Sequence, residues 1–295
     1  MENSSNGSLG FLMAKGPLSQ IVLAFVVSII LYIILISLET IYISFKQVTN
    51  TRTIIQDETM NSSKPETYVT NPMPSVSDSN KSFRKLPYSD NERTGIEYSY
   101  ACFLLITEDN FTANNTSTFK HIFHKGSTDL YPLLSPGVFV NASENSLRIY
   151  QNNTSTWYNY IDVKDIPVGK WFHFVVLVKN NATEVYVNGN ISGKITNDNS
   201  VIYQNYQNLH VFSNKQTIPA YNNGNHPSIP AGEVYMIDGK MTGSISRFYY
   251  YSYALSYTEI QDLMNMGPNP ILLTTNQDKP PYFIDNWWTG KNMLM

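Results

Sequence analysis

KWFHFVVLVKNNATEVYVNG, residues 170–189, is the stretch that decides the fold. Trp171–Val178 is a dense run of aromatic and β-branched residues, which favour β-strands. Thr183–Val187 alternates between two faces, as a half-buried strand does. The polar Lys179–Ala182 between these runs is turn-like, and Asn188-Gly189 is the strongest short-range signal for a hairpin turn. The stretch therefore predicts an antiparallel hairpin at the centre of a β-sheet.

Short strand patterns continue on both sides of this hairpin, separated by Asn-, Ser- and Gly-rich turns. The clearest are Glu97–Thr107, Phe119–Gly126, Gln207–Ser213 and Ser244–Leu255. One helix is expected after them, because Ser256 and Glu259 form a capping box and Gly267-Pro268 ends the pattern. We therefore expect an all-β fold, an antiparallel jelly-roll sandwich with one short C-terminal helix.

The N-terminal part has a different character. Ile21–Leu38 contains no charge, glycine or proline, and about 20 apolar residues are enough to cross a bilayer. The alternative is a cleaved signal peptide, but the apolar run is longer than usual and no small-x-small cleavage site follows it. We expect a single-pass membrane protein that contacts the lipid bilayer through this run.

These patterns divide the chain into five parts. They are a short polar N-terminus at 1–17, a transmembrane helix at 18–45, a flexible linker at 46–94, the β-sandwich at 95–268 and a tail rich in proline and aromatic residues at 269–295. The linker is predicted because its sequence is polar, with scattered prolines and no apolar period.

Composition excludes some classes of function. The net charge of −3 provides no basic surface for nucleic acid. Cys102 is the only cysteine, so neither an internal disulfide framework nor a cysteine-rich zinc site can form, and its apolar surroundings predict a buried small side chain.

Charges and sequons give only a weak indication of which side of the membrane carries the sandwich. Lys15 precedes the apolar run while Lys46 and Arg52 follow it, which slightly favours a cytosolic C-terminal domain. N-x-S/T sequons are numerous, which would suit a secreted domain, but many arise by chance in a chain so rich in Asn, Ser and Thr. They include Asn110, Asn115, Asn141, Asn153, Asn181 and Asn190.

Three motifs resemble the concanavalin A-like lectin/glucanase superfamily, in its laminin-G-like or pentraxin-like form. They are Trp171-x-His173 with the strand that follows, Val185–Gly189, and Gly243-x-Ile245-x-x-Phe248 leading into Ala254–Ile260. The resemblance covers roughly residues 95–268 and implies two packed antiparallel sheets. The layout of anchor and domain is also similar to that of virion membrane proteins of large DNA viruses.

Glycosidases of this superfamily use an E-x-D-x-E strand, in which two carboxylates about 5 Å apart act as acid and nucleophile. No such strand is present, so we expect no catalytic residues and no enzyme activity. No metal or cofactor is expected either, although the resemblance makes Ca²⁺ an alternative. Its oxygen ligands would come from loop carboxylates, namely Asp129, Asp162, Asp165, Glu233 or Asp238.

Exposed aromatic clusters are the remaining candidates for a binding site, because sugars and protein partners both pack on Trp and Tyr. The residues proposed are Trp157, Tyr158, Tyr160, Trp287 and Trp288. For the tryptophan pair the alternative is packing across a sheet edge.

These observations favour a membrane-anchored, non-enzymatic structural or interaction protein, whose partner would be a capsid or other virion protein. The alternative is a glycan-binding, lectin-like module at a surface, and glycoside hydrolysis is a remote third. Nucleic acid is not an expected partner.

Overall fold

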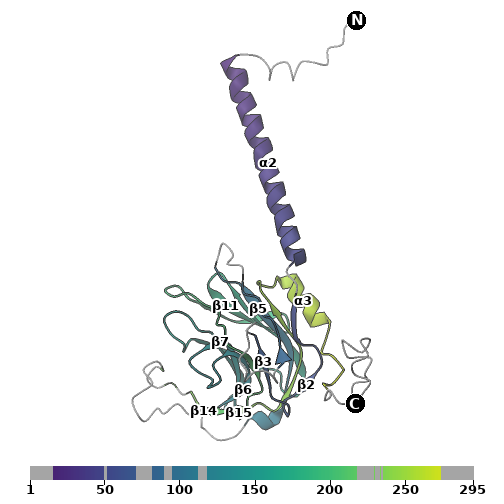
Figure 1. Ribbon diagram of the computed structural model, residues 1–295, viewed down its shortest axis with the longest axis vertical. Coiled ribbons are helices and arrows are strands. Elements are labelled where there is room, and N and C mark those ends of the chain that lie inside the picture. Colours follow the sequence, from purple (N-terminus) through teal and green to yellow (C-terminus); the bar gives the residue numbers. More distant parts are fainter. Residues whose placement is uncertain are drawn as a thin grey trace, which may run out of the picture. The chain divides into compact units, whose positions relative to one another are not determined.

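The structure, a computed structural model, describes residues 16–49, 52–70, 82–89, 95–111, 118–217, 229, 233 and 235–273. The chain forms two compact units, Met1–Thr51 and Arg52–Met295. The first contains one long helix and the second contains the β-sandwich (Figure 1).

Helix α2 spans Pro17–Thr49, slightly more than the predicted 18–45. Its segment Pro17–Tyr42 is strongly apolar, and the most apolar part of this segment is not buried against the rest of the chain. The hydroxyls of Ser28, Ser37 and Thr40 donate to the carbonyls four residues earlier. These three hydroxyls are thus satisfied within the helix, as an apolar surrounding requires. By length and composition α2 could cross a membrane, either as an anchor or as a signal sequence.

The second unit is a sandwich of two sheets, which confirms the predicted fold class. The seven-stranded sheet has the order β1-β16-β5-β10-β11-β12, with β2 paired to β16. The nine-stranded sheet has the order β4-β3-β13-β6-β7-β8-β9, with β15 paired to β6 and β14 to β15. Pairing is antiparallel except between β3 and β4 and between β6 and β15.

The elements of the second unit are β1 (Thr53–Gln56), β2 (Met60–Asn61), β3 (Glu66–Val69), β4 (Ser82–Phe83), β5 (Tyr98–Ile106), the 3-10 helix η2 (Glu108–Asn110), β6 (Phe119–Gly126), β7 (Leu134–Asn141), β8 (Ser146–Tyr150), β9 (Tyr160–Lys164), β10 (Trp171–Lys179), β11 (Ala182–Val187), β12 (Asn190–Thr196), β13 (Leu209–Val211), β14 (Gln216–Thr217), β15 (Ile237–Lys240), β16 (Gly243–Tyr251) and α3 (Tyr257–Asn265).

The predicted hairpin is confirmed by β10 and β11, and β10 lies between β11 and β5. Asn180 and Asn181 connect the two strands with φ values of 52° and 53°. Asn188 and Gly189 connect β11 to β12 with φ values of 47° and 75°. Positive φ at both central residues matches the right-handed twist of the paired strands, which explains the preference for Asn and Gly at these turns.

The predicted linker is wrong for the segment 53–69. This segment forms β1, β2 and β3, and its residues Ile55, Met60 and Tyr68 are buried in the core between the sheets. These strands have only two to four residues, too few to show a period in the sequence. Their partners are also remote in the chain, as in the pairing of Thr53 with Tyr250. The sandwich therefore begins about forty residues before the predicted boundary, at β1.

Each sheet carries buried side chains on both of its faces. On β16, Phe248 and Tyr250 lie in the core between the sheets, whereas Tyr249 and Tyr251 pack under α3. The capping box of α3 is present, with Ser256 accepting from the Glu259 N–H. Cys102 is buried in the core between the sheets, as expected. The outer face of the nine-stranded sheet carries a separate cluster of aromatic side chains, where the polar network described next is found.

Candidate functional site

The candidate site lies on the outer face of the nine-stranded sheet, over β8 and β9. Leu147, Ile149, Ile161 and Val163 point into the core, so the residues between them point outward. On this outer face Arg148 lies opposite Asp162, and Tyr150 lies opposite Tyr160. Strand pairing thus brings a cation, a carboxylate and two phenols into one row.

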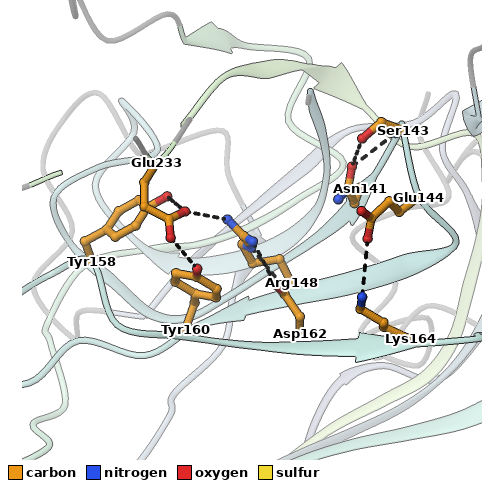
Figure 2. A network of polar contacts seen from close by, with 9 residues as sticks. All are labelled: Asn141, Ser143, Glu144, Arg148, Tyr158, Tyr160, Asp162, Lys164 and Glu233. Atoms are coloured by element: carbon orange, nitrogen blue, oxygen red, sulfur yellow. Dashed lines mark hydrogen bonds and ion pairs between the residues drawn. The ribbon is translucent and has the colours of Figure 1, made fainter. Parts of the chain in front are cut away.

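Arg148 is the centre of the polar network (Figure 2). Its Nε and Nη2 donate to the two carboxylate oxygens of Asp162, each at 2.7 Å. Its Cζ lies 3.8 Å from the ring centroid of Tyr160 and 4.8 Å from that of Phe119. Burial alone would lower the pKa of Arg148, but the hydrogen bonds to Asp162 raise it above its ordinary value. The guanidinium is therefore a permanent, tightly oriented cation.

Glu233 reaches this network from the segment between β14 and β15. Its Oε1 accepts a hydrogen bond of 2.8 Å from the Tyr160 hydroxyl, and its Oε2 accepts one of 3.3 Å from Tyr158. Oε2 also lies 3.8 Å from Nη1 of Arg148. The side chains of Asp162 and Glu233 keep 31% and 35% of their surface exposed, respectively. Two oriented carboxylates are therefore partly open to solvent.

The aromatic candidates differ in exposure. Trp157 and Tyr158 are only 8% and 5% exposed, so the prediction that they form an exposed cluster is wrong. They pack with Tyr150, Tyr235 and other residues on the outer face of the sheet, and burial raises the pKa of Tyr158 to about 12. Tyr160 is half-buried and contacts Arg148. Glu233 and Tyr235 lie over this face, and short-range sequence patterns cannot place them there.

Two further predictions concern the tryptophan pair and the carboxylates named for Ca²⁺. Trp287 and Trp288 lie outside the described residues. Among the carboxylates named for Ca²⁺, Asp129 pairs with Lys215, and Asp238 accepts from Gln216 at 2.9 Å. Asp165 follows β9 at a φ of 56°, while Asp162 and Glu233 belong to the network above. Within the described part of the chain, no group of three or more His, Cys, Asp or Glu side chains could hold a metal ion.

Sequence reasoning missed a row of buried histidines on the same outer face. His121 and His124 of β6 come together because the register of β6 shifts between His121 and Phe123. Their rings are joined by a hydrogen bond of 2.7 Å, and His124 stacks on His210 of β13 at 4.7 Å. Spacing alone gave no signal, because residues three apart on a regular strand face opposite ways.

The partners of these rings define one arrangement of protons. Nε2 of His124 donates to the Ser127 carbonyl, so its Nδ1 accepts from Nε2 of His121. Nδ1 of His121 then accepts from the Ser213 N–H at 2.9 Å. Burial lowers the pKa of His124 to about 3 and that of His121 well below its ordinary value. Both rings are neutral at pH 7 and stabilise the sheet rather than carry charge.

The sequence and this architecture define the class of the protein. Residues 97–261 match the family model described as the concanavalin A-like lectin/glucanases superfamily, which is more than half of the chain. The chain therefore belongs to this superfamily, as the sequence motifs implied. No curated protein sequence matches the chain.

Solved structures with partial similarity include domain 4 of AbnA, a GH43 extracellular arabinanase from Geobacillus stearothermophilus, in complex with arabinotriose. It is 18% identical with a TM-score of 0.36, and the match covers 57% of this chain and 66% of that one. The botulinum neurotoxin serotype D ligand-binding domain, in complex with N-acetylneuraminic acid, is 13% identical with a TM-score of 0.39. That match covers 58% of this chain and 36% of the toxin domain.

Proposed function

We propose that the β-sandwich is a carbohydrate-binding module without enzyme activity, and that α2 attaches it to a membrane. The observation that carries the proposal is the pair of partly exposed carboxylates, Asp162 and Glu233, beside the half-buried ring of Tyr160. Membership of a superfamily described as lectins and glucanases also supports carbohydrate binding. The virion role that we first expected has no support from these observations.

The carboxylates suit sugar hydroxyl groups. A carboxylate only accepts hydrogen bonds and offers about four lone-pair positions, more than the protein donors use here. Arg148 and the hydroxyls of Tyr158 and Tyr160 hold the carboxylates in place, so binding a sugar would order few side chains. The expected contacts are hydroxyl donors on Asp162 and Glu233, with the sugar ring against Tyr160.

The charge of the site selects among sugars. Arg148 is balanced by Asp162, which leaves Glu233 as an additional negative charge on this face. An acidic sugar would meet this carboxylate without a free cation among the residues of the network. We therefore propose a neutral oligosaccharide as the ligand.

The test uses the full chain in detergent on an array of neutral and acidic glycans. We expect binding to a set of neutral oligosaccharides that is lost in Glu233→Gln and weakened in Tyr160→Phe. Glu144→Gln is the matched control, because Glu144 pairs with Lys164 on the same sheet and does not contact the tyrosines (Figure 2). Absence of specific binding, or binding that Glu233→Gln leaves intact in a folded protein, would contradict the proposal.

A protein-interaction role is the second candidate. It is favoured by β12, which ends the seven-stranded sheet, has mostly exposed residues and leaves Ile191 55% exposed. An edge strand of this kind can accept a strand from a partner. Crosslinking that captures a partner through β12, together with an empty glycan array, would favour this role over sugar binding.

A further inference from the structure

Five N-x-S/T sequons place their asparagine inside the folded sandwich. Asn110 and Asn152 are 0% exposed, Asn141 and Asn153 are 8% exposed, and Asn181 is half-buried. In Asn110, Asn152, Asn153 and Asn181 the Nδ2 atom donates a hydrogen bond within the sandwich. An N-linked glycan is attached through the Nδ2 atom of such an asparagine and is a bulky surface group. The hydrogen bonds of these four Nδ2 atoms therefore decide whether the fold tolerates glycosylation.

Asn110 uses its whole amide group. Its Nδ2 donates to the carbonyls of Thr107, at 2.8 Å, and Thr242, at 2.6 Å. Its Oδ1 accepts from the N–H of Thr242 at 2.6 Å. The side chain thus joins the end of β5 to the turn before β16, and neither hydrogen of Nδ2 is left for a sugar.

Asn152 and Asn181 have the same geometry. Nδ2 of Asn152 donates to the carbonyls of Pro132 and Trp157, at 3.0 and 3.1 Å. Nδ2 of Asn181 donates to the carbonyl of Asn197 and, at 2.6 Å, to that of Ser200. Each side chain joins a turn to a second segment of backbone.

Asn153 contacts Asn197, which belongs to the backbone segment that Asn181 joins. Its Nδ2 donates to Oδ1 of Asn197 at 2.8 Å, and its Oδ1 accepts from the N–H groups of Ser155 and Thr156. Asn190, by contrast, is an exposed sequon asparagine at the start of β12, and its Nδ2 makes only a 3.3 Å contact to the carbonyl of Asn188.

N-glycosylation in the endoplasmic reticulum acts on the extended chain, before buried sites are hidden. A glycan on Asn110, Asn152 or Asn181 would then remove at least one internal hydrogen bond. On Asn110 or Asn152, which are 0% exposed, it would also place a hydrated sugar inside the fold. Buried carbonyls without a donor and a buried polar group are both strongly unfavourable. The native sandwich and exposure of this chain to luminal glycosylation are therefore incompatible.

We infer that the sandwich folds on the side of the membrane where no N-glycosylation takes place, which is the cytosolic side in a eukaryotic cell. Under this arrangement α2 is an uncleaved anchor whose N-terminal end crosses the membrane. The positive charges agree, because Lys46 and Arg52 follow the apolar run and only Lys15 precedes it. The inference does not depend on sugar binding. It implies that the sandwich binds its proposed ligand in the cytosol or after cell lysis.

The test expresses the full chain, with an epitope after Met295, in human cells that N-glycosylate. The substitutions Asn3→Gln and Asn6→Gln remove the two sequons before α2, which would lie in the lumen under the inferred arrangement. We expect no change of electrophoretic mobility after endoglycosidase treatment, and loss of the epitope when protease is added to sealed microsomes. The exposed sequon at Asn190 is a built-in reporter, since a luminal sandwich could carry a glycan there without damage.

Two results would overturn the inference. One is an endoglycosidase shift of this chain, from which the sequons before α2 have been removed, whether Asn190→Gln abolishes it or leaves it. The other is an epitope that sealed microsomes protect from protease until detergent is added. Either result would place the sandwich in the lumen, while a negative glycan array would leave this inference unaffected.

Discussion

Arg148 and Asp162 are register partners on β8 and β9, joined by two parallel hydrogen bonds of 2.7 Å on the outer face of the sheet. The Arg148 side chain is only 11% exposed, whereas that of Asp162 is 31% exposed. A guanidinium that is mostly buried depends on its carboxylate, because removal of one partner leaves an uncompensated charge.

We expect Asp162→Asn to lower the free energy of unfolding by about 2 kcal/mol, less than a fully buried pair would lose, because solvent screens the exposed carboxylate. Urea denaturation measures this loss. The double variant Arg148→Met/Asp162→Leu removes both charges and should recover much of the loss. Single and double variants that destabilise additively would show that the pair is not coupled.

The buried His173 predicts an acid-sensitive fold. Burial lowers its pKa to about 4, from an ordinary value near 6.5. Between these values the unfolded chain binds a proton that the folded chain does not, so stability is complete above pH 6.5 and falls as the pH drops toward 4. Each such histidine contributes a slope of about 1.4 kcal/mol per pH unit at most.

His173→Phe should therefore reduce the slope of unfolding free energy against pH by about one proton. The Nδ1 atom of His173 has no hydrogen-bond partner among the described residues, so the variant should be as stable as wild type at pH 7.5. Denaturant titrations at pH 4.5, 5.5, 6.5 and 7.5 give the slope. An unchanged slope would assign the acid sensitivity to His121 and His124 alone.

Gly243 is required where β16 begins. Its φ is +153°, and a Cβ there would lie 2.0 Å from the carbonyl oxygen of Leu105 on the paired strand β5. The backbone cannot move aside as a flexible side chain can. Gly243→Ala should therefore lower the free energy of unfolding by about 3 kcal/mol or more. Gly169→Ala is the matched control.

Gly169 also has a positive φ, of +69°, but a Cβ there would meet nothing within 4 Å. Its substitution should cost only the backbone strain, about 1 kcal/mol. The difference in denaturation midpoint between the two variants measures the loss of stability that results from the close approach of β5 and β16. Equal midpoints would show that the two strands can separate locally without loss.

Asn110→Asp tests the role of the buried amide nitrogen. The variant keeps the shape of the side chain but places an acceptor oxygen against the carbonyls of Thr107 and Thr242. We expect a loss of about 2–4 kcal/mol, because two donors disappear and a charge is buried. Asn190→Asp, at an exposed position, should change stability by less than about 0.5 kcal/mol.

Hydrogen exchange at the Thr242 amide locates the effect, since this N–H donates to Oδ1 of Asn110. Faster exchange there in Asn110→Asp, with little change across β11, would confirm a local loss. A variant as stable as wild type would remove the physical basis for excluding a glycan at this position.

Local patterns in the sequence predicted much of the sandwich because its hairpin depends on neighbours in the chain. The alternation of β11 and the positive-φ residues at Asn188 and Gly189 act over a few residues. The same holds for the capping box of α3. The strands β1–β3 were not predicted, because two to four residues carry no period. The partner of β1 and β2 is also remote in the chain, as in the pairing of Thr53 with Tyr250.

The sequence by itself determined the apolar helix, the β-rich fold, its superfamily and the positions of the sequons, because each follows from local composition or spacing. Only the tertiary structure decided which of these residues are accessible. It buried Trp157 and Tyr158, brought Glu233 to Tyr160 and Arg148, and enclosed the amide of Asn110. Burial depends on which distant segment covers a face, and that is a property of the folded chain and not of any short stretch within it.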